Sequence, residues 1–105
     1  MRAGWMRALG QMVAAVHDVQ ATPILVTLLP TKDPHINAEI ASVNAGIWDL
    51  ARSTNTSLLD AHGAFVSVRP VGSLFRQPNG FTDGLHPNDG GYKQLAETIA
   101  KALQA

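Results

Sequence analysis

The spacing of apolar residues along this 105-residue chain changes from one segment to the next. Between residues 3 and 19 apolar side chains recur at helical spacing, which predicts a helix with one apolar stripe. Residues 24–29, ILVTLL, are a continuous apolar run that predicts a strand buried on both faces, as in a parallel sheet. A loop is expected over residues 30–35. Apolar residues then step by four and three from Ile36 to Leu50, which predicts a second helix.

The rest of the chain predicts one more strand, a long loop and a final helix. Residues 57–63, SLLDAHG, are expected to form a short strand that residues 64–68 continue in extended form. Residues 69–82 contain prolines and glycines without a period, which predicts a long loop. Asn88 or Asp89 is expected to cap the last helix. The inner face of that helix is predicted to consist of Tyr92, Leu95, Ile99 and Leu103.

The predicted order of elements indicates an α/β layered fold. A strand, a helix and a second strand in sequence predict a right-handed parallel crossover. Two strands make a small sheet, and two-stranded pieces are marginal on their own. We therefore expect the chain to be part of one larger domain with an incomplete parallel sheet.

Composition and charge exclude several classes of function. Apolar residues make up 46% of the chain and charged residues 15%, which is ordinary for a globular protein. The formal net charge is zero and no basic run is present, so a nucleic-acid partner is not expected. No apolar run approaches the roughly 20 residues that span a membrane. The absence of cysteine excludes disulfides and thiolate metal sites.

The segment FTDGLHPNDGGYKQL, residues 81–95, contains the candidate chemistry. Asp83 precedes His86 by three residues, so its carboxylate can accept a hydrogen bond from Nδ1 and leave Nε2 as a general base. Gly84 permits a tight turn between them, and Pro87 favours an extended conformation at His86. The alternative is an ordinary turn and helix cap with a surface histidine, and spacing alone leaves both interpretations open.

The segment DGLHPNDGGYKQLAETIAKAL resembles the last sequence block of the GDSL/SGNH hydrolases, which are esterases, lipases and related acylhydrolases. Upstream, ILVTLLP and SLLDAHGAF resemble the fourth and fifth strands of that family, so the resemblance covers nearly all of the chain. It implies a three-layer α/β/α, flavodoxin-like fold. Residues 1–105 would be the carboxyl-terminal half of one such domain, and the sheet would lack its amino-terminal strands.

The same resemblance implies an activity and two site residues. Asp83 and His86 would be the acid and base of a Ser-His-Asp triad that hydrolyses a small acyl ester without cofactor or metal. The family's G-D-S and G-x-N-D blocks, which carry the nucleophile and the oxyanion-hole groups, are absent from this sequence. The chain has five serines, which are expected to be structural or solvated, with Ser73 the candidate nucleophile among them: Ser42, Ser53, Ser57, Ser67 and Ser73.

Two other hypotheses remain. The chain can be a truncated, catalytically inactive half-domain whose exposed ILVTLL edge pairs with a second copy, so that it forms a homo-oligomer or binds a missing amino-terminal half. A metal-assisted hydrolase would instead combine His86 with loop acids. The pairs Asp33/His35 and Asp60/His62 lie on separate predicted loops without the spacing of a zinc site.

Overall fold

The computed structural model describes residues 2–68 and 86–104. The described helices and strands follow the predicted order, with one additional short helix. The two strands are parallel, and Ile24 pairs in register with Ser57. This confirms a partial α/β fold with a small parallel sheet. The elements are α1 (Arg2–Asp18), β1 (Ile24–Val26), α2 (Pro34–Thr54), β2 (Ser57–Leu59), α3 (Ala61–Val66) and α4 (Asp89–Gln104).

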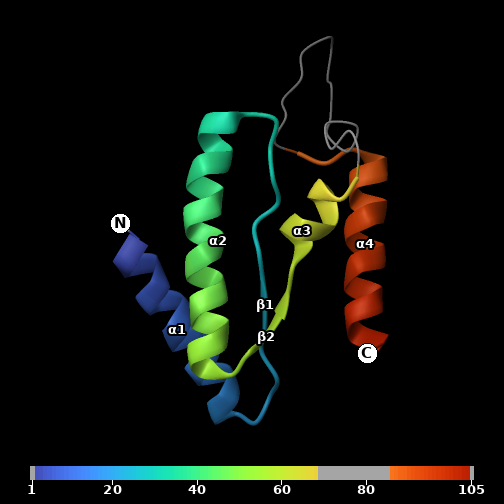
Figure 1. The fold of residues 1–105 in the computed structure, drawn as a ribbon. Coiled ribbons are helices and arrows are strands. Elements are labelled where there is room, and N and C mark those ends of the chain that lie inside the picture. The colour runs from blue at the N-terminus through green and yellow to red at the C-terminus, as the bar shows by residue number, and fades with distance from the viewer. Residues whose placement is uncertain (1, 69–85, 105) are drawn as a thin grey trace.

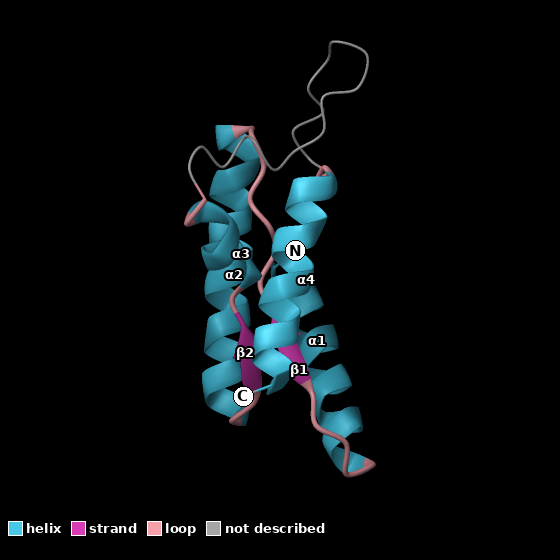
Figure 2. Ribbon diagram, turned by 90° about the vertical axis from the view of Figure 1, so that its right-hand side faces the viewer, coloured by secondary structure: helices cyan, strands magenta, loops and turns pink. Residues whose placement is uncertain are grey.

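The elements form three layers. Figures 1 and 2 show α1 and α2 on one face of the strands and α3 and α4 on the other. The chain passes from β1 through α2 to β2, which is the parallel crossover that the sequence predicted. None of the described helices is both long enough and apolar enough to cross a lipid bilayer.

Helix α2 begins earlier than predicted. The Asp33 side chain accepts a hydrogen bond from the backbone N–H of His35, and Pro34 occupies the first turn, where its missing N–H costs nothing. The expected loop over residues 30–35 is therefore wrong at its last two positions. At the other end Asn55 adopts a left-handed conformation with φ 51° and terminates the helix.

Strand β1 is shorter than the apolar run predicted. Its pairing with β2 continues as far as the Thr27 N–H, which donates to the Leu59 carbonyl at 3.1 Å. At Leu28 the backbone bonds instead to the side chain of Asn44 in α2. Its N–H donates to Oδ1 at 2.8 Å and its carbonyl accepts from Nδ2 at 3.1 Å. The predicted strand over residues 24–29 is therefore wrong for its last three residues.

Residues 61–66 form a short helix where a strand and extended chain were expected. The Asp60 carboxylate accepts a hydrogen bond from the Gly63 N–H at 3.0 Å and so caps the first turn. A Cβ at Gly63 would collide with that carboxylate, so the glycine makes room for the cap. Because the cap ends β2 at Leu59, the predicted strand is shortened to three residues.

The core formed by residues 2–68 and 86–104 consists of two separate clusters. The larger one joins α1, α2 and the strands through Val13, Leu25, Ile47 and Ala51. The smaller one surrounds Phe65, which is fully buried against Leu29, Val68 and Leu95.

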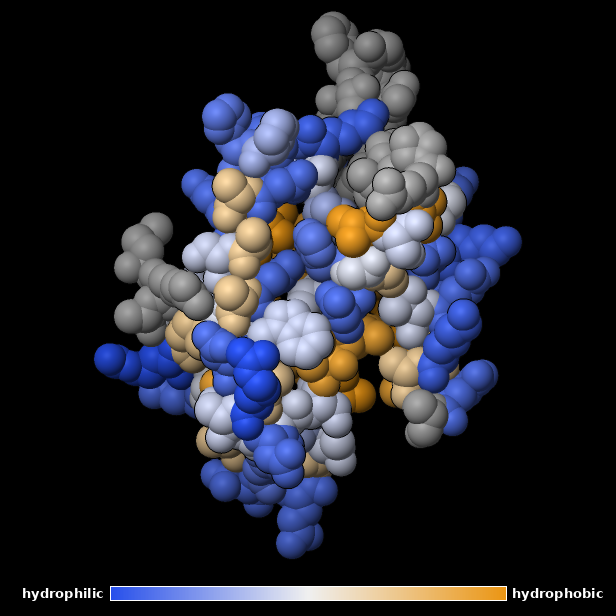
Figure 3. Space-filling model, in the orientation of Figure 1, coloured by the Kyte–Doolittle hydropathy of each residue, from blue (hydrophilic) through white to orange (hydrophobic). Residues whose placement is uncertain are grey.

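The predicted inner face of α4 is only partly covered. Leu95 packs on the smaller cluster, whereas Tyr92, Ile99 and Leu103 are 45%, 39% and 67% exposed. Figure 3 shows apolar surface in the hollow between α4 and the centre of the molecule. The face of the molecule that α4 borders therefore leaves apolar side chains in contact with solvent.

Candidate functional site

A hydrogen-bonded network joins the carboxyl ends of the two strands. Thr27 is buried, and its hydroxyl donates to Asp60 Oδ1 at 3.0 Å while accepting from the backbone N–H of His62 at 3.0 Å. The same Asp60 oxygen caps α3 through Gly63. Thr27 and Asp60 thus fix the start of α3 against β1, with the His62 side chain half-buried beside them.

A second set of contacts holds the chain that leaves β1. Asn37 accepts a hydrogen bond from the Thr31 N–H at 2.7 Å and donates to the Thr31 carbonyl at 2.8 Å. Asn44 likewise accepts a hydrogen bond from the Leu28 N–H and donates one to the Leu28 carbonyl. The two asparagines are seven residues apart on α2 and so lie on the same side of the helix. Together they hold residues 28–31 along α2 at the end toward which the strands run.

His86 lies immediately before α4. Its side chain is exposed, while the neighbouring Pro87 is buried. Asn88 begins the helix: its Oδ1 accepts from the Gly91 N–H at 2.9 Å, and its carbonyl accepts from the Tyr92 N–H at 2.9 Å. This confirms the predicted cap. Figure 1 shows the segment 86–88, in orange, at the end of the molecule toward which both strands run.

The short helix α3 supports the position of α4. Gln94 of α4 donates to the Ala64 carbonyl of α3 at 3.1 Å, and Leu95 packs on Phe65 nearby. Because α3 is fixed to the strand ends through Asp60 and Thr27, the start of α4 is linked to the sheet through these contacts. His86 thus precedes a helix that is tied to the carboxyl end of β2.

Several predicted site residues lie outside the described residues. Asp83, Gly84 and Ser73 are among them, as is most of the predicted loop 69–82. The pairing of Asp83 with His86 and the role of Ser73 therefore stay predictions.

The described serines have ordinary positions. The Ser53 hydroxyl donates to the Leu50 carbonyl at 3.2 Å, and the Ser67 hydroxyl donates to the Ala64 carbonyl at 2.7 Å. Ser42 is exposed on α2 and Ser57 is exposed in β2. These positions agree with the structural or solvated roles expected of them.

The other candidate histidines, His35 and His62, form hydrogen bonds with different residues: the His62 backbone N–H donates to Thr27. His35 is exposed at the start of α2, and its backbone N–H donates to Asp33. Within residues 2–68 and 86–104, no three histidine or acidic side chains come together as ligands for a metal.

The buried polar residues were missed by the sequence analysis. Thr27 interrupts the apolar run ILVTLL, and Asn44 stands between Val43 and Ile47 on the apolar side of α2. A polar residue within an apolar pattern is the signal that could have identified both, because buried polar groups require hydrogen-bond partners.

Comparison with solved structures identifies the fold. The chain matches a GDSL-like lipase from Bacteroides thetaiotaomicron with a TM-score of 0.75 and 21% identity, over 99% of this chain and 53% of the lipase. It matches the esterase domain of the ORF1 protein from the zebrafish ZfL2-1 retrotransposon with a TM-score of 0.79 and 20% identity, over 100% of this chain and 64% of that domain. The chain has a GDSL/SGNH hydrolase-like fold.

A third solved structure agrees with these two. A protein from Bacteroides fragilis assigned as an acylhydrolase matches with a TM-score of 0.74 and 24% identity, over 99% of this chain and 52% of its own. No protein-family model and no curated protein matches the sequence. The chain therefore spans between about half and two thirds of the length of the structures that share its fold.

Proposed function

We propose that residues 1–105 are the carboxyl-terminal half of an SGNH hydrolase-like domain and contribute the acid and base of a serine esterase. The observation that carries the proposal is the Asp-x-x-His-Pro sequence directly before α4, in a chain with a GDSL/SGNH hydrolase-like fold. In this proposal His86 is the general base and then the general acid, and Asp83 orients its imidazole. The substrate is a small acyl ester.

The proposed reaction has two steps. The Oγ atom of a serine attacks the ester carbonyl carbon while His86 Nε2 takes the hydroxyl proton, and the proton passes to the departing alcohol as the carbon–oxygen bond breaks. Water then attacks the acyl-enzyme, gives its proton through His86 to the serine oxygen, and releases the acid. Asp83 holds the histidine tautomer that leaves Nε2 free to accept the first proton.

The identity of the serine is the part that an experiment must supply. A fluorophosphonate probe forms a covalent adduct with an activated serine, so intact mass and peptide mapping reveal both its presence and its position. An adduct that forms in the wild type and disappears in His86→Ala would show that the chain supplies the nucleophile as well as the base. His35→Ala is the matched control, because His35 is also exposed and lies outside the proposed site. Any adduct that the wild type forms should persist in this variant.

The experiment also separates this chain's own activity from that of a longer assembly. An adduct on Ser73 that depends on His86 would mean that the chain assembles a nucleophile by itself. The absence of any adduct in well-folded wild type would contradict hydrolysis by this chain alone.

A second candidate function is an assembly role without turnover. The observation that favours it is the edge of β1, which no described strand covers. In this proposal the chain joins a partner through that edge, and the homodimer expected from the sequence is one form of the assembly. The Asp83–His86 pair would then be retained without catalysis.

A further inference from the structure

The turn that joins α2 to β2 contains the sequence Asn55-Thr56-Ser57. Asn-x-Ser is the sequence in which asparagine accepts an N-linked sugar, provided that the middle residue is not proline. Of the five asparagines in the chain, Asn55 alone is followed two residues later by serine or threonine. Such a short motif occurs by chance in many proteins, so the structure around Asn55 must show whether its side chain can be reached.

The backbone of this turn is fixed, while its side chains are accessible. Asn55 has a φ of 51°, in the left-handed region that asparagine tolerates better than most residues. The Thr56 N–H donates to the Ala51 carbonyl at 2.9 Å and so closes the end of α2. Asn55 and Ser57 are both exposed, and neither side chain forms a hydrogen bond with another described residue. The amide that would accept a sugar and the hydroxyl that the motif requires are therefore both available to an enzyme.

An open hollow of about 470 Å³ lies beside the turn. Trp48 and Arg52 are one helical turn apart on α2, and Asn55 follows three residues later, so the three lie along one side of the helix. Trp48 is 39% exposed, although it is a large aromatic residue. The hollow is lined by Trp48, Ala51, Arg52, Asn55, Thr56 and Leu58.

The chemistry of this hollow suits a sugar ring. A sugar has a face of C–H groups and a rim of hydroxyl groups, and an aromatic side chain can cover the C–H face and bury its apolar area. The Arg52 guanidinium has five N–H donors, and its ion pair with Asp49 is formed through Nη2. Its other nitrogens form no hydrogen bond with a described residue and can donate to sugar hydroxyls. A sugar attached at Asn55 would thus find an apolar surface and polar donors next to it.

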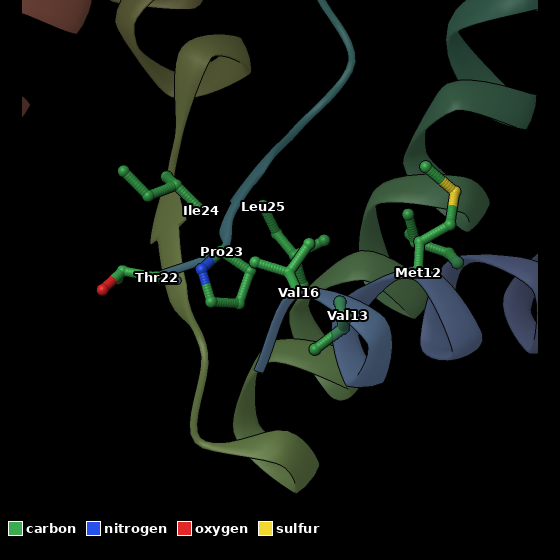
Figure 4. Close-up of a pocket in the computed structure, with 8 residues that line it drawn as sticks. Met12, Val13, Val16, Thr22, Pro23, Ile24 and Leu25 are labelled. Atoms are coloured by element: carbon green, nitrogen blue, oxygen red, sulfur yellow. The ribbon is translucent and has the colours of Figure 1, made fainter. Parts of the chain in front are cut away.

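The hollow between α1 and β1 has a different lining. It measures about 290 Å³, and Figure 4 shows Val13 and Val16 of α1 close to Leu25 in it. Thr22 is its one polar side chain, and no charged or amide side chain lines it. Of these two hollows, the one beside Trp48 therefore has the mixture of aromatic and polar groups that a sugar requires.

We propose that Asn55 is an N-glycosylation site whose first sugar packs on Trp48. The sugar is supplied by a donor in which a diphosphate activates its C1 atom. Nδ2 of Asn55 forms a bond to C1 as the bond between C1 and the diphosphate oxygen breaks, and the diphosphate leaves with both electrons of that bond. Nδ2 gives one of its two protons to a base of the transferring enzyme.

The proposed glycosylation site lies far from the segment that contains His86. Figure 1 shows the turn between α2 and β2 at the bottom of the molecule and residues 86–88 at the opposite end. Ser57 is the first residue of β2, so the turn lies where this strand begins, whereas His86 lies at the end toward which it runs. A sugar at Asn55 leaves that end uncovered. The inference therefore goes beyond both candidate functions and depends on neither.

The test offers the purified full chain two sugar donors, each with an enzyme that uses it. One arm contains a membrane oligosaccharyltransferase and a lipid diphosphate oligosaccharide, and the other contains a soluble N-glycosyltransferase and a nucleotide diphosphate sugar. Intact mass and peptide mapping should show one glycan, on Asn55, in at least one arm, and that arm identifies the class of donor. Ser57→Ala keeps the asparagine but removes the hydroxyl of the motif, so it should lose the product completely. Ser57→Thr keeps a hydroxyl and should retain it.

The contact with Trp48 is measured by fluorescence quenching. In a Trp5→Phe chain Trp48 is the one remaining tryptophan. A sugar packed on its exposed face should lower the quenching of Trp48 fluorescence by acrylamide. Asn55→Gln in the same chain accepts no sugar, so its quenching should stay that of the unmodified chain after the same treatment. Ser57 and Asn55 are exposed, so these variants should fold, which circular dichroism checks.

Three results would overturn the inference. The first is an absence of product in both arms with folded wild type, and the second is a product that persists in Ser57→Ala or lies on another residue. The third is a chain glycosylated at Asn55 whose Trp48 is quenched as before, which would overturn the packing of the sugar. Fluorophosphonate labelling is independent of all three, so failure here leaves the esterase proposal standing.

Discussion

At the scale of single residues, the Asn44 side chain forms the two hydrogen bonds with Leu28 that a neighbouring peptide unit would form. A side-chain amide offers one carbonyl and one N–H group, as a peptide unit does, and Asn44 uses both on Leu28. Asn44 is buried, so its amide depends on this pairing for its hydrogen bonds. The residue thus holds the chain that follows β1.

Asn44→Leu should therefore destabilise the chain by about 1–3 kcal/mol. The substitution keeps a side chain of similar size on α2 but removes both hydrogen bonds to the partly buried Leu28 backbone. Urea unfolding measures the loss. Asn44→Asp keeps an acceptor for the Leu28 N–H but places a buried carboxylate oxygen against the Leu28 carbonyl, so at neutral pH it should destabilise the chain at least as much as Asn44→Leu.

Ser42→Ala is the matched control for this change. Ser42 is exposed two residues away on the same helix, and its replacement should change stability by less than about 0.5 kcal/mol. Equal stability of wild type and Asn44→Leu would show that water replaces the lost bonds at no cost.

The sequence could indicate that Asn44 and Thr27 are unusual, but not which groups they bind. Their partners are 16 and 33 residues away in the chain, at Leu28 and Asp60. No periodic pattern encodes such a pairing, because it depends on how α2 and the strands are placed in space. His86 was easier to identify, since its candidate partner Asp83 and its helix cap Asn88 are local.

At the scale of elements, strong apolar periodicity predicted the long helices correctly. Short elements, which have no clear period, were predicted wrongly. Helix α1 and the body of α2 lie where apolar spacing predicted them. Helix α3 was missed because it has six residues, too few for a period, and because its cap at Asp60 is stabilised by Thr27, which follows β1 and is distant in the sequence. The apolar stripe of α4 was correctly identified, but the stripe could not reveal that Leu95 packs on the smaller cluster while its other three residues are 39–67% exposed.

Helix α4 depends on α3 for its attachment, and Phe65 is the main contact. Phe65→Ala removes the one fully buried large side chain of the smaller cluster and should cost about 3–5 kcal/mol there. If α4 loses about 3 kcal/mol of protection, its amides should exchange about 100-fold faster. Hydrogen exchange read by mass spectrometry should show this in α4 and little change in α2.

Ile99→Ala is the control for α4 itself. Ile99 lies on the same helix but is 39% exposed, so its removal should have a small effect. If α2 and α4 lose protection equally in Phe65→Ala, the two clusters are coupled more strongly than their contacts indicate.

At the scale of the whole molecule, the chain exposes more surface than its mass predicts. Its accessible surface is 6981 Å², whereas a folded monomer of 11.2 kDa is expected to expose about 5,700 Å². Exposed apolar side chains on β1 and α4 contribute to the difference. This excess agrees with a chain that spans about half to two thirds of the structures sharing its fold.

The two clusters should unfold at different urea concentrations. Trp5 and Trp48 lie in α1 and α2, so tryptophan fluorescence reports the larger cluster, while far-UV circular dichroism also reports α4. The smaller cluster rests on one fully buried side chain and a few contacts between α3 and α4, so it should open first. The dichroism at 222 nm should therefore begin to fall before the fluorescence changes. Coincident transitions of fluorescence and dichroism would instead indicate one cooperative unit.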